Sequence, residues 1–315
     1  MRSKSLQIAP ARLQRLAERL LRGAGSGPEE AEVVAANLVK SNLVGHDSHG
    51  IGYLPEYIRT AVAGRLVPNQ KPLIVTDAGP IIVLDGQRGY GQVMGREAML
   101  RGIDRAKDLG ACIVSLRNSH HLGRIGAWAS MATDAGLASI HMVNVAGHTP
   151  LVSPFGGADA RLGTNPFTAA FPSSGADGAS DAEPPPVTLD MATSKIALGK
   201  ARNAFFAGEA LDPGLVIDSQ GYDTTDPGVM FPGDSAIRDG SLARGALKPL
   251  GDHKGFGLGL VCEIFGAIAT GGTLHLALPL TPRLSPLRSL PSCFFPPPLS
   301  PIPLSFLRLP RSLTR

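Results

Sequence analysis

Two histidine motifs contain the residues of this sequence that are best suited to chemistry. The first covers residues 45–50 (GHDSHG) and the second covers residues 118–123 (NSHHLG). Each motif places imidazole in a polar turn flanked by glycine, and imidazole titrates near neutral pH, so a held histidine is a common proton shuttle. Because His49 and His121 are 72 positions apart, the two motifs predict one active site built from distant segments. The chain is therefore interpreted first as an enzyme.

The residues within the two motifs differ in their predicted roles. His121 is the predicted acid/base, and His49, which lies between Ser48 and Gly50, is predicted to face the same site. Neighbouring side chains in an extended turn point apart, so His120 is assigned to orientation or packing. Ser48 is predicted to hydrogen-bond a substrate or His49, since it is not part of a G-x-S-x-G nucleophile motif.

A metal-dependent hydrolase or lyase is an alternative interpretation of the same histidines. His46 and His49 could form a metal-binding pair, and zinc would then need further ligands such as Asp47 or His121. We expect no metal, and His46 is interpreted as a structural histidine. The sequence contains neither a G-x-G-x-x-G dinucleotide fingerprint after a strand nor a P-loop motif.

A second group of polar residues follows an apolar segment that ends at Asp190. This carboxylate is predicted either to cap the next helix or to orient an imidazole or a cofactor group. Thr193 and Ser194, at the expected start of a helix, would suit a phosphate group. Lys254 could neutralise that phosphate, the alternative being a solvated lysine.

Hydrophobic periodicity predicts an α/β protein with an N-terminal helical region. The strands are expected to be buried, and His121 is expected between a strand end and a helix start, where α/β sheets form their ligand crevice. The stretch 145–186 is rich in glycine and proline and should hold few regular elements. Helices are predicted at 10–22, 28–44, 54–63, 91–108, 124–135, 195–206 and 255–268, and strands at 72–76, 81–85, 111–116, 137–143 and 187–191.

Composition narrows the class of protein. A hydrophobic content of 43% in 315 residues is enough for a full core. The net charge of +4 does not indicate nucleic-acid binding, because residues 273–315 contribute five arginines and no Lys, Asp or Glu, which leaves −1 for residues 1–272. Three widely spaced cysteines predict a reducing compartment. The sequence has no long apolar run, so we expect neither a secretory signal nor a membrane span. We therefore expect a cytoplasmic protein.

Residues 273–315 differ from the rest of the chain. They hold ten prolines and twelve leucines, together with serine and arginine, and they contain no glycine. Such a segment has no helix or strand period. It is predicted to be either a disordered proline-rich tail that could dock on an aromatic groove or, our preferred hypothesis, the product of a shifted reading frame.

Taken together, the motifs resemble the malate/L-lactate dehydrogenase family that lacks a Rossmann fold. The resemblance covers about residues 10–272 with the motifs in family order, and it is greatest to the hydroxycarboxylate dehydrogenase branch. The matching motifs are GHDSHGIGYLPEY (45–57), RNSHHLGRIGAWA (117–129), PFGG (154–157), GTNPF (163–167), LDMATS (189–194), GKAR (199–202), TTDP (224–227) and HKGFGL (253–258).

This resemblance implies a reversible, NAD- or NADP-dependent reduction of a 2-oxo acid to a 2-hydroxy acid. It implies that His121 is the catalytic acid/base, and that His49, also a catalytic residue, contacts the substrate or helps to place it near the nicotinamide. The substrate-binding residues would be Ser48, Tyr53, His120 and Arg124; some branches carry arginine where Tyr53 stands, so Arg124 is the candidate clamp for the substrate carboxylate. The cofactor-binding residues would be Leu122, Gly123, Asp190, Met191, Ala192, Thr193, Ser194, Lys254 and Gly255.

The resemblance also implies a fold and an assembly. The fold would be a non-Rossmann mixed sheet like that of L-sulfolactate dehydrogenase, in a homodimer. Residues 1–72 would form the helical region and pack with 245–272, and residues 73–244 would form the cofactor-binding α/β domain. Because the family continues past 272 with further helices, the alternative is a truncated, inactive relative, and we expect weak NAD(P)H binding or poor folding.

Overall fold

Three N-terminal helices pack around one core. The computed structural model describes residues 7–147, 149–173, 184–233 and 244–272; the predictions for 273–315 lie outside these residues. Helices α1 (Pro10–Gly23), α2 (Pro28–Leu43) and α3 (Leu54–Val62) confirm the three predicted N-terminal helices. The first two begin with proline, whose fixed φ suits the first helical turn. Their shared core contains Leu21, Leu38 and Tyr57, each fully buried.

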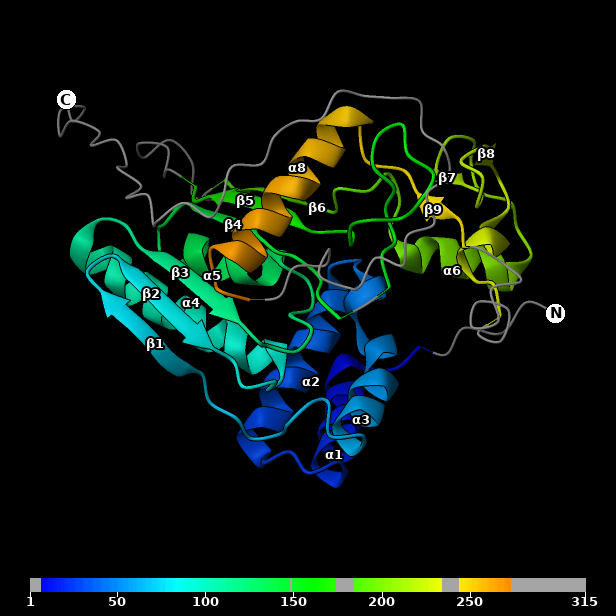
Figure 1. The fold of residues 1–315 in the computed structure, drawn as a ribbon. Coiled ribbons are helices and arrows are strands. Elements are labelled where there is room, and N and C mark those ends of the chain that lie inside the picture. The colour runs from blue at the N-terminus through cyan, green and yellow to red at the C-terminus, as the bar shows by residue number, and fades with distance from the viewer. Residues whose placement is uncertain (1–6, 148, 174–183, 234–243, 273–315) are drawn as a thin grey trace. The chain divides into compact units, whose positions relative to one another are not determined.

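The first sheet is mixed, as predicted. Strand β1 (Leu73–Ala78) pairs antiparallel with β2 (Ile81–Asp85), and β2 pairs parallel with β3 (Ile113–Arg117). The parallel connection runs through α4 (Gly91–Leu109), which packs on β3 (Figure 1). The prediction of buried strands is wrong for β1, because every residue of this strand is exposed. It also fails for β3 and for the strands at 139–142 and 187–191, which contain no buried residue. Strand β1 lies at the edge of its sheet and has a neighbouring strand on one side only.

The second sheet is antiparallel and consists of β4 (Ser139–Met142), β5 (Phe167–Phe171) and β6 (Val187–Met191). Strand β5 lies in the stretch where few regular elements were expected. Helix α5 (Gly126–Asp134) packs on all three strands. Helix α8 (His253–Glu263) and the π-helical turn η4 (Ile264–Ile268) together occupy the position of the last predicted helix, 255–268.

The contacts of α8 and η4 bear on the predicted domain arrangement. Within this chain α8 packs on β4 and β5, and η4 packs on β3. Packing of residues 245–272 against the N-terminal helices stays a prediction. In the part of the chain that the structure describes, no helix combines the length and apolar composition that crossing a membrane requires.

A third, small sheet lies beside the remaining helices. It consists of β7 (Val216–Ile217), β8 (Asp223–Thr224) and β9 (Ala246–Leu247), all antiparallel. The 3-10 turn η3 (Pro227–Met230) packs on β9 and on helix α6 (Leu198–Ala207). Helix α6 begins at residue 198 instead of 195, because the backbone N–H of Lys195 donates to Lys248 and Ser194 forms a β-bridge with Pro249.

Candidate active site

The first histidine motif forms two short 3-10 turns after α2. These are η1 (Asp47–His49) and η2 (Ile51–Tyr53). Asn42, near the end of α2, holds both turns, because its amide nitrogen donates to Asp47 Oδ1 at 2.5 Å and its oxygen accepts from the Ile51 N–H at 2.8 Å. Ser48 Oγ lies 2.9 Å from His49 Nδ1, so the predicted Ser48–His49 hydrogen bond is present.

The second histidine motif is held by the segment that follows β2. The N–H of Arg88 donates to the Asn118 carbonyl at 2.6 Å, and the N–H of His120 donates to the Gly89 carbonyl at 2.9 Å. Asn118 itself has a φ of +52°, and its side chain donates to Asp85 Oδ2 at 2.8 Å. These hydrogen bonds fix the path of the motif from the end of β3 to the start of α5. His121 thus lies between a strand end and a helix start, as predicted.

The two motifs meet through their rings. The ring centroids of His49 and His121 are 5.5 Å apart, with 23° between the planes. The ring of Tyr53 stacks on that of His121 at 4.6 Å and 19°. The structure therefore brings together His49, Tyr53 and His121, three residues that the sequence placed in one site. His120 packs differently, with its ring edge-on to Tyr57 at 5.7 Å.

Two buried residues behind His121 were not among the predicted site residues. Tyr57 OH lies 2.8 Å from His121 Nδ1, and the amide nitrogen of Gln92 donates to Tyr57 OH at 2.7 Å. Both side chains are fully buried. Tyr57 follows Tyr53 by four positions, a spacing that puts both rings on one helical face and could have identified it. Gln92 carries no comparable signal.

Helix α6 closes another side of the site. Its Gly199 faces Ser48 so closely that a Cβ at this position would lie 3.1 Å from the Ser48 Cβ. Arg202, on the same helix, lies near enough to Tyr53 to lower its pKa, although burial has the larger effect and raises the pKa of Tyr53 overall. The GKAR motif thus contributes to the site, although neither residue was a predicted site residue.

Burial and charge tune His49. Burial lowers the pKa of His49, and the nearby His46 lowers it further, whereas the Asp190 carboxylate acts in the opposite direction. The two histidine rings of the first motif are 5.8 Å apart. His49 is therefore held in its neutral form down to a lower pH than an exposed histidine.

Asp190 organises the segment after His121. Its Oδ2 accepts from the Gly126 N–H at 2.9 Å and lies 3.5 Å from Arg124 Nη1, and its Oδ1 accepts from Thr168 Oγ1 at 2.8 Å. The carboxylate thus caps α5 instead of the next helix in sequence. Arg124, the candidate carboxylate clamp, keeps only 12% of its side chain exposed. An arginine in that position is ready to pair a second carboxylate.

Asp190 also faces His141 across the second sheet. His141, Thr168 and Asp190 are cross-strand partners in the β4–β5–β6 register, so their side chains share one face. Burial lowers the pKa of His141 to about 4, although Asp190 acts in the opposite direction. The ring nitrogen Nε2 is 3.0 Å from Ser139 Oγ.

We predict that His141 makes the fold sensitive to acid. The pKa of His141 is about 4 in the native chain and ordinarily 6.5, so between these pH values the unfolded chain binds a proton at His141 and the native chain does not. Stability should therefore fall as the pH drops from about 6.5 towards 4, by about 2 kcal/mol between pH 7 and pH 5. Urea unfolding of the wild type and of His141→Gln at both pH values measures this; equal losses in the two proteins would contradict it.

The predicted cofactor residues lie in different environments. Thr193 is buried, and its hydroxyl and its N–H both donate to backbone carbonyls in the segment 164–165. Ser194 Oγ donates to the Ile196 carbonyl. These groups already form hydrogen bonds inside the protein, and α6 begins only at residue 198. Thr193 and Ser194 therefore do not stand at a helix start, which was the reason for expecting a phosphate there. Gly255 is packed against the backbone of Leu250.

Lys254 is the predicted cofactor residue whose environment best fits an anion. It is exposed in the first turn of α8, at the end of a helix that carries a positive partial charge. Among the described residues it forms no ion pair, whereas its neighbour Asp252 pairs with Lys195 at 3.1 Å. Lys254 and this helix end therefore suit the phosphate groups of a dinucleotide. Leu122, Gly123, Met191 and Ala192 contribute no charged group.

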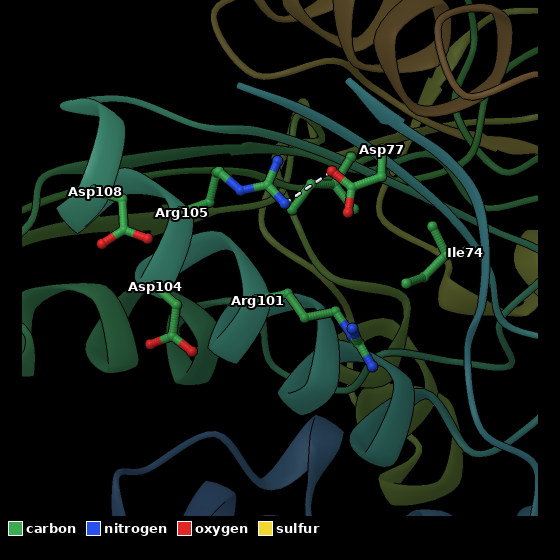
Figure 2. Close-up of a pocket in the computed structure, with 7 residues that line it drawn as sticks. Ile74, Asp77, Arg101, Asp104, Arg105 and Asp108 are labelled. Carbon is green, nitrogen blue, oxygen red and sulfur yellow. Dashed lines mark ion pairs between the residues drawn. The ribbon is translucent and has the colours of Figure 1, made fainter. Parts of the chain in front are cut away.

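A separate surface hollow of about 250 Å³ lies between the first sheet and α4. Figure 2 shows the ion pair of Arg105 with Asp77, which are 2.8 Å apart, at this hollow. None of the predicted site residues lines it. In the described parts of the chain, no three His, Cys, Asp or Glu side chains lie close enough to hold a metal ion, so the metal-dependent alternative has no ligand set there.

Comparison with known proteins assigns the family. Residues 8–285 match the family model described as malate/L-lactate dehydrogenase. The chain is 44% identical over 257 residues to hydroxycarboxylate dehydrogenase B of Escherichia coli O157:H7, a match that covers 81% of this chain and 66% of that protein. It is 39% identical over 268 residues to L-lactate dehydrogenase of Cupriavidus necator, covering 85% of this chain and 72% of the relative.

A solved structure confirms the predicted fold. The sulfolactate dehydrogenase of Methanocaldococcus jannaschii superposes with a TM-score of 0.71 at 32% identity, covering 85% of this chain and 71% of that one. The chain spans just under two thirds of the length of the E. coli relative. With a family model that matches most of its length and a shared fold, the chain belongs to the malate/L-lactate dehydrogenase family.

Proposed function

We propose that this chain is an oxidoreductase that interconverts a 2-oxo acid and a 2-hydroxy acid with NAD or NADP. The observation that carries the proposal is the stack of His49, Tyr53 and His121, which unites two distant motifs in a member of this family. The names of the relatives, which include L-lactate and hydroxycarboxylate dehydrogenases, support the class of substrate.

His121 would carry the proton transfer. When bound, a reduced nicotinamide supplies the hydride that forms the new C–H bond at the carbonyl carbon. The carbonyl π bond breaks, and the oxygen takes a proton from Nε2 of protonated His121, which ends neutral with its remaining proton on Nδ1. In the reverse direction the neutral ring with its proton on Nδ1 accepts the hydroxyl proton at Nε2. Since Nδ1 faces Tyr57, Nε2 is the nitrogen on the other side of the ring.

Arg124 would bind the substrate carboxylate. It follows His121 by three positions, and the 3.5 Å pair with Asp190 holds its guanidinium in place. Ser48, His49 and Tyr53 would line the opposite wall and reduce the access of water to the transferred proton. Lys254 and the N-terminal end of α8 would hold the phosphate groups of the cofactor.

The assembly and the location belong to the same proposal. The family resemblance favours a homodimer, which light scattering on the purified chain would measure. Cys112 and Cys262 are both free, which fits the reducing environment of the cytoplasm.

The test is a turnover assay with a parallel binding assay. We expect loss of NADH or NADPH absorbance with at least one of pyruvate, oxaloacetate and sulfopyruvate, and quenching of protein fluorescence by the same cofactor. Cofactor binding without turnover of any 2-oxo acid would favour the inactive-relative alternative. Binding of neither cofactor would contradict the proposal.

A further inference from the structure

A buried relay lies behind His121. Tyr57 on α3 is fully buried, with its hydroxyl 2.8 Å from His121 Nδ1 and 2.7 Å from the amide nitrogen of Gln92 in the first turn of α4. The rings of Tyr90 and His120 lie edge-on to the Tyr57 ring, at 5.9 and 5.7 Å. The phenol is thus fixed by packing on two sides and by hydrogen bonds at its oxygen.

The direction of these hydrogen bonds determines which nitrogen of His121 carries a proton. Burial raises the pKa of Tyr57 far above its ordinary value, so its hydroxyl keeps its proton at any working pH. Because the Tyr57 oxygen already accepts from Gln92, its one proton is available for Nδ1. An Nδ1 that accepts a hydrogen bond belongs to a neutral ring with its proton on Nε2.

Protonated His121 needs the opposite arrangement. Its Nδ1–H must donate to the Tyr57 oxygen, and the phenol proton must then turn to another acceptor. Gln92 Oε1 is such an acceptor, since it is buried and has no hydrogen-bond partner among the described residues. A half-turn of the amide would bring this oxygen to the position of the nitrogen. A buried acceptor without a partner costs about 1–3 kcal/mol, so it calls for a physical explanation.

We propose that Tyr57 and Gln92 form a two-state relay of positioning residues, which gives His121 Nδ1 a partner in both protonation states. When the neutral ring carries its proton on Nε2, Gln92 donates to Tyr57 and Tyr57 donates to Nδ1. Whenever Nδ1 carries a proton, as in the protonated ring, both bonds reverse. The proposal rests on the proposed function, because His121 can exchange a proton at Nε2 only while Nδ1 carries the other proton, and only the reversed arrangement gives that Nδ1–H an acceptor.

The other groups around His121 stay the same in both states. Two titratable rings that stack on His121 are those of His49, at 5.5 Å between ring centroids, and Tyr53, at 4.6 Å. Arg124 follows His121 by three positions in the chain and pairs with Asp190 on β6. None of these four needs to change for the relay to reverse, so variants of Tyr57 and Gln92 test it separately.

The test is nitrogen NMR of the histidine rings in the protein alone, which requires no turnover. Protein labelled with ¹⁵N-histidine is compared with His121→Gln to assign the ring signals of His121. We expect neutral His121 to carry its proton on Nε2 in the wild type, and Tyr57→Phe to yield a mixture of both tautomers. Wild-type His121 protonated on Nδ1, or an unchanged spectrum in Tyr57→Phe, would overturn the proposal.

A second variant tests the reversed state. Gln92→Met removes the acceptor for the phenol proton, so protonation of His121 should be disfavoured and its NMR titration should move about one unit to lower pH. An unmoved titration would contradict the two-state relay. Tyr90→Phe, which deletes a hydroxyl from the neighbouring buried tyrosine, is the matched control and should leave the His121 signals unchanged.

Kinetics provides the independent readout. Tyr57→Phe should lower kcat about tenfold and leave KM nearly unchanged, because the phenol acts through His121 without contacting the substrate. A raised KM with an unchanged kcat would contradict the positioning role. If the wild type shows no turnover, the proposed function fails, and the NMR result still decides whether the relay exists.

Discussion

His121→Gln is expected to lower kcat/KM for 2-oxo acid reduction by a factor of about 10²–10⁴. Glutamine keeps a polar side chain of similar reach but has no group that can give up a proton near neutral pH. The Tyr57 hydroxyl that faces Nδ1 at 2.8 Å would retain a polar partner, so the fold should survive. Steady-state kinetics together with far-UV circular dichroism measures both effects.

The control for this variant is His46→Gln. His46 is in the same turn, but its ring lies 5.8 Å from that of His49 and the structure places it in no stack with His121. We expect its kcat/KM to stay within a few-fold of the wild type. A His121→Gln enzyme that keeps its activity, or a His46→Gln enzyme that loses as much, would show that the wrong histidine has been assigned as acid/base.

Gly91→Ala is expected to produce the largest structural effect. Gly91 is the first residue of α4, and a Cβ at this position would overlap the backbone carbonyls of His120 and His121. Backbone cannot rotate away as a side chain can, so either α4 or the histidine motif must shift. We expect destabilisation by about 3 kcal/mol, together with a loss of turnover greater than the loss of folded protein.

Urea unfolding and activity per folded molecule test the Gly91 prediction. Gly23→Ala is the matched control, because Gly23 ends α1 and a Cβ there would meet nothing within 4 Å. Alanine at position 23 should be neutral or slightly stabilising, since it restricts the unfolded chain. Equal stability of the two variants would contradict the close approach of α4 to His121.

Periodic segments were predictable from the sequence because each carries its own signal. The helices α1, α2 and α4 follow clear apolar stripes, and the first two begin with proline, so their ends were predicted within about one or two residues. Strand β5 was missed because it lies in a stretch that is rich in glycine and proline. Its pairing with β4 and β6 supplies the stability that its own sequence does not.

The site was predictable in part. His49 and His121 are marked by polar, glycine-flanked turns, and the structure brings their rings together. Tyr57 shares a helical face with Tyr53, but Gln92 could not be separated from core residues, because burial is decided by which helices pack together. Asp190 was predicted either to cap the helix that follows it or to orient an imidazole or a cofactor group, and tertiary packing brings α5 to its carboxylate. Pair contacts of this kind depend on three-dimensional packing that local patterns do not contain.

The ring contact between His49 and His121 also has a consequence for refolding. It joins segments 72 positions apart, and non-local contacts form only after the entropy of closing a long loop has been overcome. Local helices such as α1 and α2 face no such delay. After dilution from denaturant, helical signal should therefore return before the stacked rings do. Enzymatic activity should therefore return later than helical signal during refolding. A chain can regain much of its secondary structure while it is still without activity.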